Sequence, residues 1–193
     1  ILHDAYETHD MGTHGFNYTL RQPVGVAGCI SPWNLPLYLF TWKIAPALAA
    51  GNTVVAKPSE VTPASAFLLW KILDDIDFPP GVLNIVHGLG GEVGAAIVAH
   101  LDVPIVSCTG GIQTGKAISA VAAPMFKKLS LELGGKNANI VFEDCDFDEA
   151  VKTSVRAAFA NQGQICLCGS RIYIQRSIYD KFKEAFVARV KGL

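Results

Sequence analysis

The alternation of short apolar runs with helical segments is the feature that most constrains the fold of this chain. Four apolar runs are each followed by a segment with apolar residues at helical spacing, and a fifth run closes the series. Such alternation predicts right-handed crossovers and an open, mostly parallel, Rossmann-like α/β sheet with helices on both faces. The expected strands are residues 24–30, 53–56, 82–86, 104–108 and 128–133, and the expected helices are residues 37–50, 63–73, 91–100 and 114–121.

A second α/β segment follows residue 133. Asp146 is the expected N-cap of a helix at residues 147–159, and Ser177 is the expected N-cap of a last helix. That last helix carries an apolar stripe whose partner surface is expected to be missing, so the stripe should promote association. The expected strands are residues 139–142 and 171–174, and the stripe consists of Tyr179, Phe182, Phe186 and Val190.

The composition limits the possible functions. Half of the 193 residues are hydrophobic and 17% are charged, which excludes a disordered chain. The formal net charge of -1 argues against a nucleic-acid partner and against binding to a membrane surface. The five cysteines are odd in number and lack CxxC spacing, so neither a disulfide framework nor a metal site is expected. These features favour a soluble, cytoplasmic protein that binds small molecules.

Residues that directly follow the expected strands should lie at one edge of the sheet, where ligands of such folds bind. Two of these segments are rich in glycine: residues 88–94 have the spacing GxGxxxG, and residues 110–115 lead into a helix. Bare amides at a helix N-terminus attract phosphate groups, so the two segments together favour a dinucleotide. Residues 88–94 alone are better explained as an ordinary turn between strand and helix.

Lys57 and Glu60 follow the second expected strand and bear on the kind of dinucleotide. A lysine there can donate hydrogen bonds to ribose hydroxyls, and a glutamate three residues later can accept one from a 2′-hydroxyl while repelling a 2′-phosphate. The pair therefore favours NAD over NADP. The alternative is a solvated ion pair at the start of a helix.

Three side chains suggest chemistry, and each has a structural alternative. Cys166 follows a segment that ends a helix early at Gly163, so its thiol would lie on a turn, unless it is a buried filler. Glu132 stands in a strand-like apolar alternation, where burial would suit a general base, unless it points at water. Asn34 lies between two prolines as a rigid donor for an oxyanion, or as a turn residue bonded to its own backbone.

Several motifs in fixed order resemble the aldehyde dehydrogenase superfamily over nearly the whole chain. They are PWNLP (residues 32–36), WK (42–43), APALAAGN (45–52), KPSE (57–60), TGG (109–111), LELGGK (131–136) and NQGQIC (161–166). The combination is specific to the family, although no single motif is. Residues 23–38 and 165–171 resemble most closely the members that oxidise muconic semialdehydes.

The resemblance implies NAD-dependent oxidation of an aldehyde to the carboxylic acid, with Cys166 as the nucleophile that forms a thioester. Glu132 would be the general base, and Asn34 with the backbone N–H of Cys166 would form the oxyanion hole. The residues that face NAD would be Ile30, Ser31, Trp33, Lys57, Glu60, Gly90, Gly94, Gly110, Gly111, Gly115 and Leu133.

The chain departs from the family pattern in three ways. A phenylalanine is common at the position of Cys108, and a serine is common at the position of Gly111. The glycine leaves a backbone amide alone for one phosphate contact. The glutamate-phenylalanine-glycine-proline motif that holds the nicotinamide ribose in family members has no counterpart here, and those members are much longer.

These departures imply an internal fragment of a homo-oligomeric enzyme. It would contain the end of an N-terminal oligomerisation segment (residues 1–22), an NAD-binding domain (residues 23–133) and part of a catalytic domain (residues 134–193). Two alternatives to NAD-dependent aldehyde oxidation follow. One is a non-catalytic NAD-binding or interaction fragment, because half of the catalytic domain is absent. The other is a thiol-dependent esterase that needs Cys166 and Glu132 but no NAD.

Overall fold

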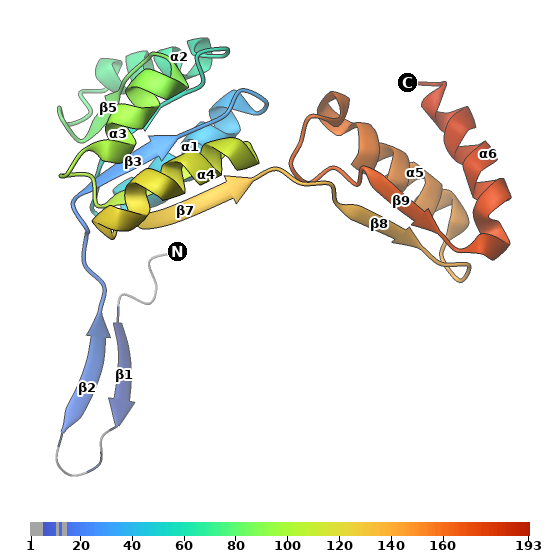
Figure 1. The fold of residues 1–193 in the computed structure, drawn as a ribbon, viewed down its shortest axis with the longest axis horizontal. Helices are drawn as coiled ribbons and strands as arrows, with labels where there is room; N and C mark the ends of the chain where they lie inside the picture. The colour runs from blue at the N-terminus through green and yellow to red at the C-terminus, as the bar shows by residue number, and fades with distance from the viewer. Residues whose placement is uncertain (1–5, 11, 13–14) are drawn as a thin grey trace. The chain divides into compact units, whose positions relative to one another are not determined.

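The chain divides into two compact units, unit 1 (residues 1–133) and unit 2 (residues 134–193), whose elements are labelled in Figure 1. Each unit has its own hydrophobic core. The computed structural model describes residues 6–10, 12 and 15–193, and the other residues of the expected segment 1–22 lie outside this description. Unit 1 begins with an antiparallel hairpin of two strands, β1 (Tyr6–Asp10) and β2 (Phe16–Leu20).

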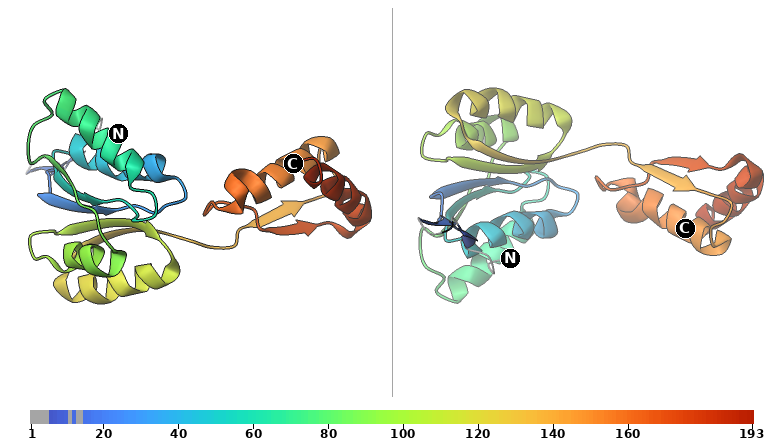
Figure 2. Two further views of the ribbon diagram at one scale, coloured as in Figure 1. Left: turned by 90° about the horizontal axis from the view of Figure 1, so that it is seen from above. Right: turned by 90° about the horizontal axis from the view of Figure 1, so that it is seen from below.

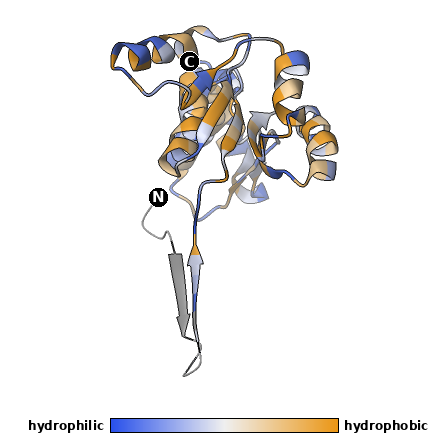
Figure 3. Cartoon of the chain, turned by 90° about the vertical axis from the view of Figure 1, so that its left-hand side faces the viewer, coloured by the Kyte–Doolittle hydropathy of each residue, from blue (hydrophilic) through white to orange (hydrophobic). Residues whose placement is uncertain are grey.

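A parallel sheet forms the centre of unit 1. Its strands are β3 (Val26–Ile30), β4 (Thr53–Lys57), β5 (Leu83–Ile85), β6 (Ile105–Gly110) and β7 (Lys128–Leu133). Their order is β5-β4-β3-β6-β7, and each neighbouring pair is parallel. The three central strands β4, β3 and β6 each bury at least half of their residues, as expected of strands covered on both faces, and Figure 3 colours the chain by hydropathy. The expected open α/β sheet is confirmed.

Helices cover both faces of this sheet (Figure 2). They are α1 (Pro36–Ala49), α2 (Ala64–Asp75), the π-helical turn η2 (Gly90–Gly94), α3 (Ala95–Ala99) and α4 (Ile112–Ala122). On one face Phe40 of α1 is buried in a core with Cys29 of β3. On the other face Ile97 of α3 and Ile118 of α4 are buried with Val106 of β6. The two cores lie on opposite faces of the sheet, because successive side chains of a strand point to opposite faces. In β3, for example, Cys29 belongs to the first core and Ile30 packs against the second.

The ends of α1 follow from its sequence. Pro36 begins the helix, where its missing N–H removes no helical hydrogen bond. Gly51, just beyond the helix, has a φ of 80°, which glycine adopts without strain. The Asn52 side chain then accepts a hydrogen bond from the N–H of Val24 (2.8 Å) and donates one to the carbonyl of Ala47 (3.0 Å). These bonds join the end of α1 to the chain that enters β3.

The helix expected at residues 91–100 is instead two short pieces, η2 and α3. Gly90, Gly91 and Gly94 occupy its first turn, and glycine is a poor helix former because it loses more backbone entropy than other residues. The other expected elements lie within a few residues of the observed ones. Among the described residues, no helix is both long and apolar enough to cross a membrane.

Unit 2 is a small α/β unit. Its elements are the parallel strands β8 (Ala138–Val141) and β9 (Arg171–Ile174) and the helices α5 (Phe147–Phe159) and α6 (Tyr179–Val190). The expected cap of α5 is confirmed, because the Asp146 carboxylate accepts a hydrogen bond of 3.1 Å from the N–H of Glu149.

The expected cap of α6 is wrong, and the expectation of an uncovered stripe is wrong for its central residue. Ser177 donates a hydrogen bond to the Glu143 carboxylate, and the N-cap of α6 is Ile178, without a side-chain cap. The apolar stripe of α6 is covered in part inside unit 2, because Phe182 is fully buried and lies edge-on to Phe147 of α5, with 6.0 Å between ring centroids, whereas Tyr179 is 46% exposed. The preceding helix, rather than a missing segment, covers this residue.

Phe182→Ala should lower the free energy of unfolding by about 3–5 kcal/mol, because it leaves a cavity in the core of unit 2. Phe142→Ala is the matched control, since Phe142 is 61% exposed, and should cost less than about 1 kcal/mol. Urea unfolding followed by circular dichroism measures both. Equal losses for the two variants would contradict the packing of α6.

Candidate functional site

The carboxyl ends of β3 and β6 form the switch point of the sheet. After β3 the chain continues to β4 and β5 on one side, and it then returns to β6 on the other side of β3. Ile30 pairs with Lys57 of β4 and with Cys108 of β6. The loops that follow β3 and β6 therefore lead to opposite sides of the sheet, which is where ligands bind in open α/β folds.

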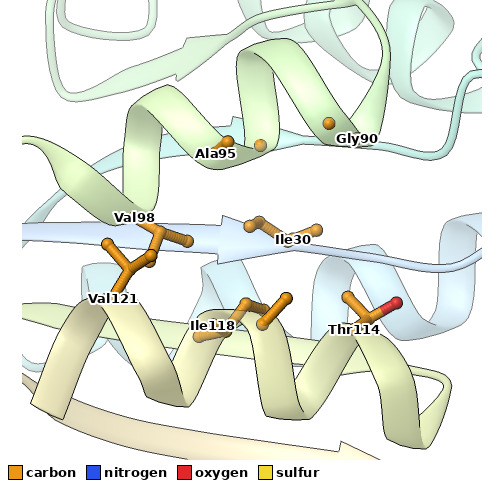
Figure 4. Close-up of a pocket in the computed structure, with 10 residues that line it drawn as sticks. Ile30, Gly90, Ala95, Val98, Thr114, Ile118 and Val121 are labelled. Carbon is orange, nitrogen blue, oxygen red and sulfur yellow. The ribbon is translucent and has the colours of Figure 1, made fainter.

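A groove of about 430 Å³ lies beside the switch point (Figure 4). Ile30 of β3 lies between two walls, one formed by η2 and α3 and the other by α4. The wall residues are Gly90, Gly91, Gly94, Ala95, Val98, Thr114, Ala117, Ile118 and Val121. All of these except Thr114 are apolar or glycine, so the groove suits a flat, largely apolar group.

The first glycine-rich turn is held by backbone conformation and close packing. Gly88 has a φ of 146°, and a Cβ there would lie 2.4 Å from Cγ2 of Val93. Any side chain at Gly88 would therefore clash. Gly90 has no described atom within 4 Å of where its Cβ would be, so its backbone is accessible to a ligand. A Cβ at Gly94 would make ordinary contacts with Lys57 and Ile30.

The second glycine-rich segment begins α4. Gly111 is the N-cap of this helix, and the described residues leave the space beside it open. Gly110 is half-buried, and a Cβ there would make ordinary contacts with Thr114. Gly115 is buried, and a Cβ there would lie 2.7 Å from Leu133 of β7. The absence of a side chain at Gly115 therefore lets α4 pack on β7, a role that the spacing did not predict.

Lys57 and Glu60 form an ion pair of 3.0 Å at the same edge of the sheet. The Lys57 side chain is 2% exposed and also donates to the carbonyl of Pro58 (3.0 Å), so this is not the solvated pair of the alternative interpretation. The pKa of Glu60 is lowered, first by a hydrogen bond from its own backbone N–H and then by the Lys57 side chain. Glu60 is therefore an anionic, 44% exposed acceptor.

Ser31 lies directly after β3 and is 4% exposed. Its N–H donates to the carbonyl of Lys57 (3.1 Å), but its hydroxyl has no hydrogen-bond partner among the described residues. A buried hydroxyl without a partner costs about 1–3 kcal/mol, so it marks a place where a ligand or a water would bind. Trp33, two residues later, is 45% exposed.

Asn34 and Glu132 both lie at the carboxyl-end edge of the sheet. Asn34 is half-buried in the loop between β3 and α1, and Glu132 is the last but one residue of β7. Of the two alternatives for Glu132, the structure supports exposure, because β7 is an edge strand that alternates exposed and half-buried residues, and Glu132 is on the exposed side.

Lys43 is a buried charge that sequence reasoning missed. It lies in α1 and is 8% exposed, and its Nζ donates a hydrogen bond of 3.2 Å to the Ser107 hydroxyl of β6. Burial lowers its pKa, against the smaller effects of Cys108, Cys29 and Glu132, which favour the charged form. The available signal was a single lysine within an otherwise apolar helix.

The thiol turn, residues 160–168, connects α5 to the chain that enters β9. Asn161 (φ 51°), Gln162 (φ 56°) and Gly163 (φ 73°) are all left-handed, an arrangement that non-glycine residues rarely adopt. The Asn137 amide donates a hydrogen bond to the carbonyl of Cys166 (2.6 Å). Asn137 directly precedes β8, so this bond joins the turn to the start of that strand. Strained backbone of this kind is concentrated at functional sites. Gly163 thus has the unusual φ that its position predicted.

The five cysteines differ in burial. Cys29 and Cys108 are core residues of unit 1, and burial raises the pKa of both thiols, to about 11 for Cys29. Cys168 is also buried, with its thiol 3.9 Å from the carbonyl of Ala160. Cys166 and Cys145 are partly exposed. Because Cys145 packs against the core of unit 2, Cys166 is the best candidate for a reactive thiol.

The structure gathers the predicted cofactor residues of unit 1 at one end of its sheet, around β3, β4 and β6. Asn34 and Glu132 belong to the same edge, whereas Cys166 belongs to unit 2. The meeting of the thiol with Asn34 and Glu132 stays a prediction. Among the described residues, no cluster of histidine, cysteine or acidic side chains could hold a metal ion.

Comparison with known proteins places these features in context. A profile described as the aldehyde dehydrogenase family matches residues 2–193. The 2-aminomuconic semialdehyde dehydrogenase of Homo sapiens is 58% identical over 187 residues, which are 96% of this chain and 38% of that protein. The 2-hydroxymuconic semialdehyde dehydrogenase of Pseudomonas putida is 51% identical and covers 100% of this chain and 39% of its own length.

A crystal structure of betaine aldehyde dehydrogenase from Staphylococcus aureus, in complex with NAD+, superposes with a TM-score of 0.91 at 44% identity. The match covers 97% of this chain and 37% of that one. PnpE in complex with nicotinamide adenine dinucleotide gives a TM-score of 0.89, also at 44% identity, over 95% of this chain and 38% of that one. The chain thus spans well under half the length of each relative.

Iodoacetamide at about pH 8 should alkylate Cys166 at least about tenfold faster than Cys29. With a pKa of about 11, the Cys29 thiol is almost entirely protonated at this pH, and the thiolate is the reactive form. Mass spectrometry of digested samples measures both rates. The two cysteines should react at similar rates after unfolding in guanidinium, and faster labelling of Cys29 in the folded protein would contradict the assignment.

Proposed function

Because the chain belongs to the aldehyde dehydrogenase family, we propose that the protein oxidises an aldehyde to a carboxylic acid with NAD as the hydride acceptor. The observation that carries the proposal is the edge of unit 1, where an apolar groove, a buried lysine paired with an exposed glutamate, and an unsatisfied serine hydroxyl lie around one switch point. Each of these features suits one part of a dinucleotide. The three together support such a ligand more strongly than any one of them alone.

The residues of unit 1 fit the parts of NAD. The groove between η2, α3 and α4 would take the adenine ring, and Lys57 with Glu60 would bind ribose hydroxyls. The backbone at Gly90 and the N-terminus of α4 at Gly111 would face the pyrophosphate, which favours amides at a helix start. Ser31 and Trp33 would line the path toward the nicotinamide. When bound, NAD supplies the acceptor for the hydride that leaves the substrate carbon.

In the proposed mechanism the Cys166 thiolate attacks the aldehyde carbon and forms a carbon–sulfur bond. The Asn34 amide and the backbone N–H of Cys166 hold the resulting oxyanion. Loss of hydride leaves a thioester on Cys166. Glu132 then removes a proton from a water molecule as that water attacks the thioester carbonyl, the carbon–sulfur bond breaks, and the acid and the thiolate are released.

We further propose that the substrate is a semialdehyde, that is, an aldehyde with a carboxylate at its other end. Two of the relatives described above are named for muconic semialdehydes, and they are 58% and 51% identical to this chain. The substrate of the complete protein would then be a small, anionic and partly apolar molecule.

Cys166→Ala should reduce NADH formation in the complete protein by at least about 1000-fold, because it removes the nucleophile. NAD binding, measured by calorimetry, should persist because the proposed NAD-binding residues lie in unit 1. Cys145→Ala is the matched control, since Cys145 is a partly exposed cysteine of unit 2 outside the proposed site, and it should stay within about fivefold of the wild type. Undiminished oxidation by Cys166→Ala would refute the mechanism. Binding without any NADH formation by the wild type would instead support the non-catalytic, NAD-binding alternative.

Glu60→Gln should weaken NAD binding about tenfold and narrow the preference for NAD over NADP. The substitution removes the charge that would accept from the 2′-hydroxyl and repel a 2′-phosphate, and a hydrogen bond to a charged group is worth about 1.5–3 kcal/mol. Calorimetric titration with both dinucleotides tests this. Glu184→Gln, an exposed glutamate of α6, should bind both as the wild type does. An unchanged preference in Glu60→Gln would remove Glu60 from the site.

A further inference from the structure

Unit 2 contains a pocket of about 310 Å³ beside the thiol turn. Ile165 and Leu167, the two neighbours of Cys166 in the sequence, both line it, and the rest of its wall comes from α5 (Thr153, Arg156, Ala157) and from Ala160 and Cys168 of the thiol turn. Its size is at the lower end of the range of small-molecule sites, about 300–1000 Å³. A molecule held in this pocket would therefore lie next to the residue proposed as the nucleophile.

Arg156 is the one charged residue among those that line the pocket. The other lining residues are alanines, Ile165, Leu167, Cys168 and Thr153, so the surface around Arg156 is largely apolar. An apolar pocket with a single cation suits a ligand that has a carbon chain and one anionic end. The planar guanidinium can bind both oxygens of a carboxylate at once.

Within the part of the chain that the structure describes, the Arg156 guanidinium has no hydrogen-bond or ion-pair partner. The residues three and four positions away on the helix are Lys152, Thr153, Phe159 and Ala160, none of which is acidic. The nearby carboxylate of Glu149 is already paired with Lys152 at 2.9 Å. The positive charge of Arg156 is thus available to a ligand.

A structural role for Arg156 is the alternative. The residue lies in the last turn of α5, where a positive charge interacts favourably with the helix dipole. Arg189 also lies in the last turn of its helix, α6, but does not line the pocket. Arg189 therefore provides a control in which the helix-end role is present and the pocket is not.

We propose that Arg156 is a specificity-determining residue that binds the carboxylate of an aldehyde substrate whose carbon chain occupies the pocket beside Cys166. The proposal rests on the proposed function and deepens it, because it assigns the recognition of the anionic end of a semialdehyde to a residue of this chain. Arg156 positions the substrate and takes no part in bond formation.

The test compares 5-oxopentanoate with pentanal, two aldehydes of the same chain length that differ in the carboxylate. In the complete protein, Arg156→Gln should lower kcat/KM for 5-oxopentanoate about 10- to 100-fold, mainly through KM, and leave pentanal within about threefold. Arg156→Lys should lie between the wild type and Arg156→Gln for 5-oxopentanoate, since it keeps the charge but loses the two-pronged geometry. Arg189→Gln should match the wild type with both aldehydes.

Equal losses with both aldehydes, or no loss with either, would overturn the role of Arg156. A second measurement does not depend on turnover: the dicarboxylate glutarate should slow the alkylation of Cys166 by iodoacetamide in the wild type but not in Arg156→Gln. Equal protection of both proteins, or protection of neither, would also overturn the proposal. Failure of the wild type to oxidise any aldehyde with NAD would instead refute the proposed function, while the protection experiment would still decide the role of Arg156.

Discussion

The parallel pairing of β3 with β4 on one side and β6 on the other is the constraint on which unit 1 depends. The strand can occupy this central place because its middle residues are small. A Cβ at Gly28 would lie 2.7 Å from Ile97 and 3.0 Å from Val103, so a larger residue would push α3 away from the sheet. Close packing on both faces of β3 fixes the switch point, and the switch point in turn fixes where the groove and Ser31 lie.

Buried charge is the second constraint at this edge. Lys57 and Lys43 are both buried, and burying a lysine is costly unless a partner compensates. Lys57 has the Glu60 carboxylate and the Pro58 carbonyl, whereas Lys43 has the Ser107 hydroxyl. Stability alone would favour apolar residues at such places. The charge of Glu132 also favours the charged form of Lys43.

Unit 2 shows a different way of placing a functional group. The thiol turn holds Asn161 and Gln162 in left-handed conformations, each of which costs of order 1 kcal/mol or more. The hydrogen bond from Asn137 to the carbonyl of Cys166 is one of the contacts that maintain this turn. The strain and this hydrogen bond are both local to unit 2, so the conformation of the thiol turn is set within that unit.

The sequence by itself determined the α/β class, the order of the strands along the chain and the Asp146 cap, because each of these depends on local periodicity or on a residue and its near neighbours. It also placed Cys166 on a turn through Gly163. Only the tertiary structure decided that Phe182 is covered, that Gly115 serves packing against Leu133, that Glu132 is exposed, and that Lys43 is buried beside Ser107. These properties depend on which distant segments meet, and neither periodicity nor spacing carries that information.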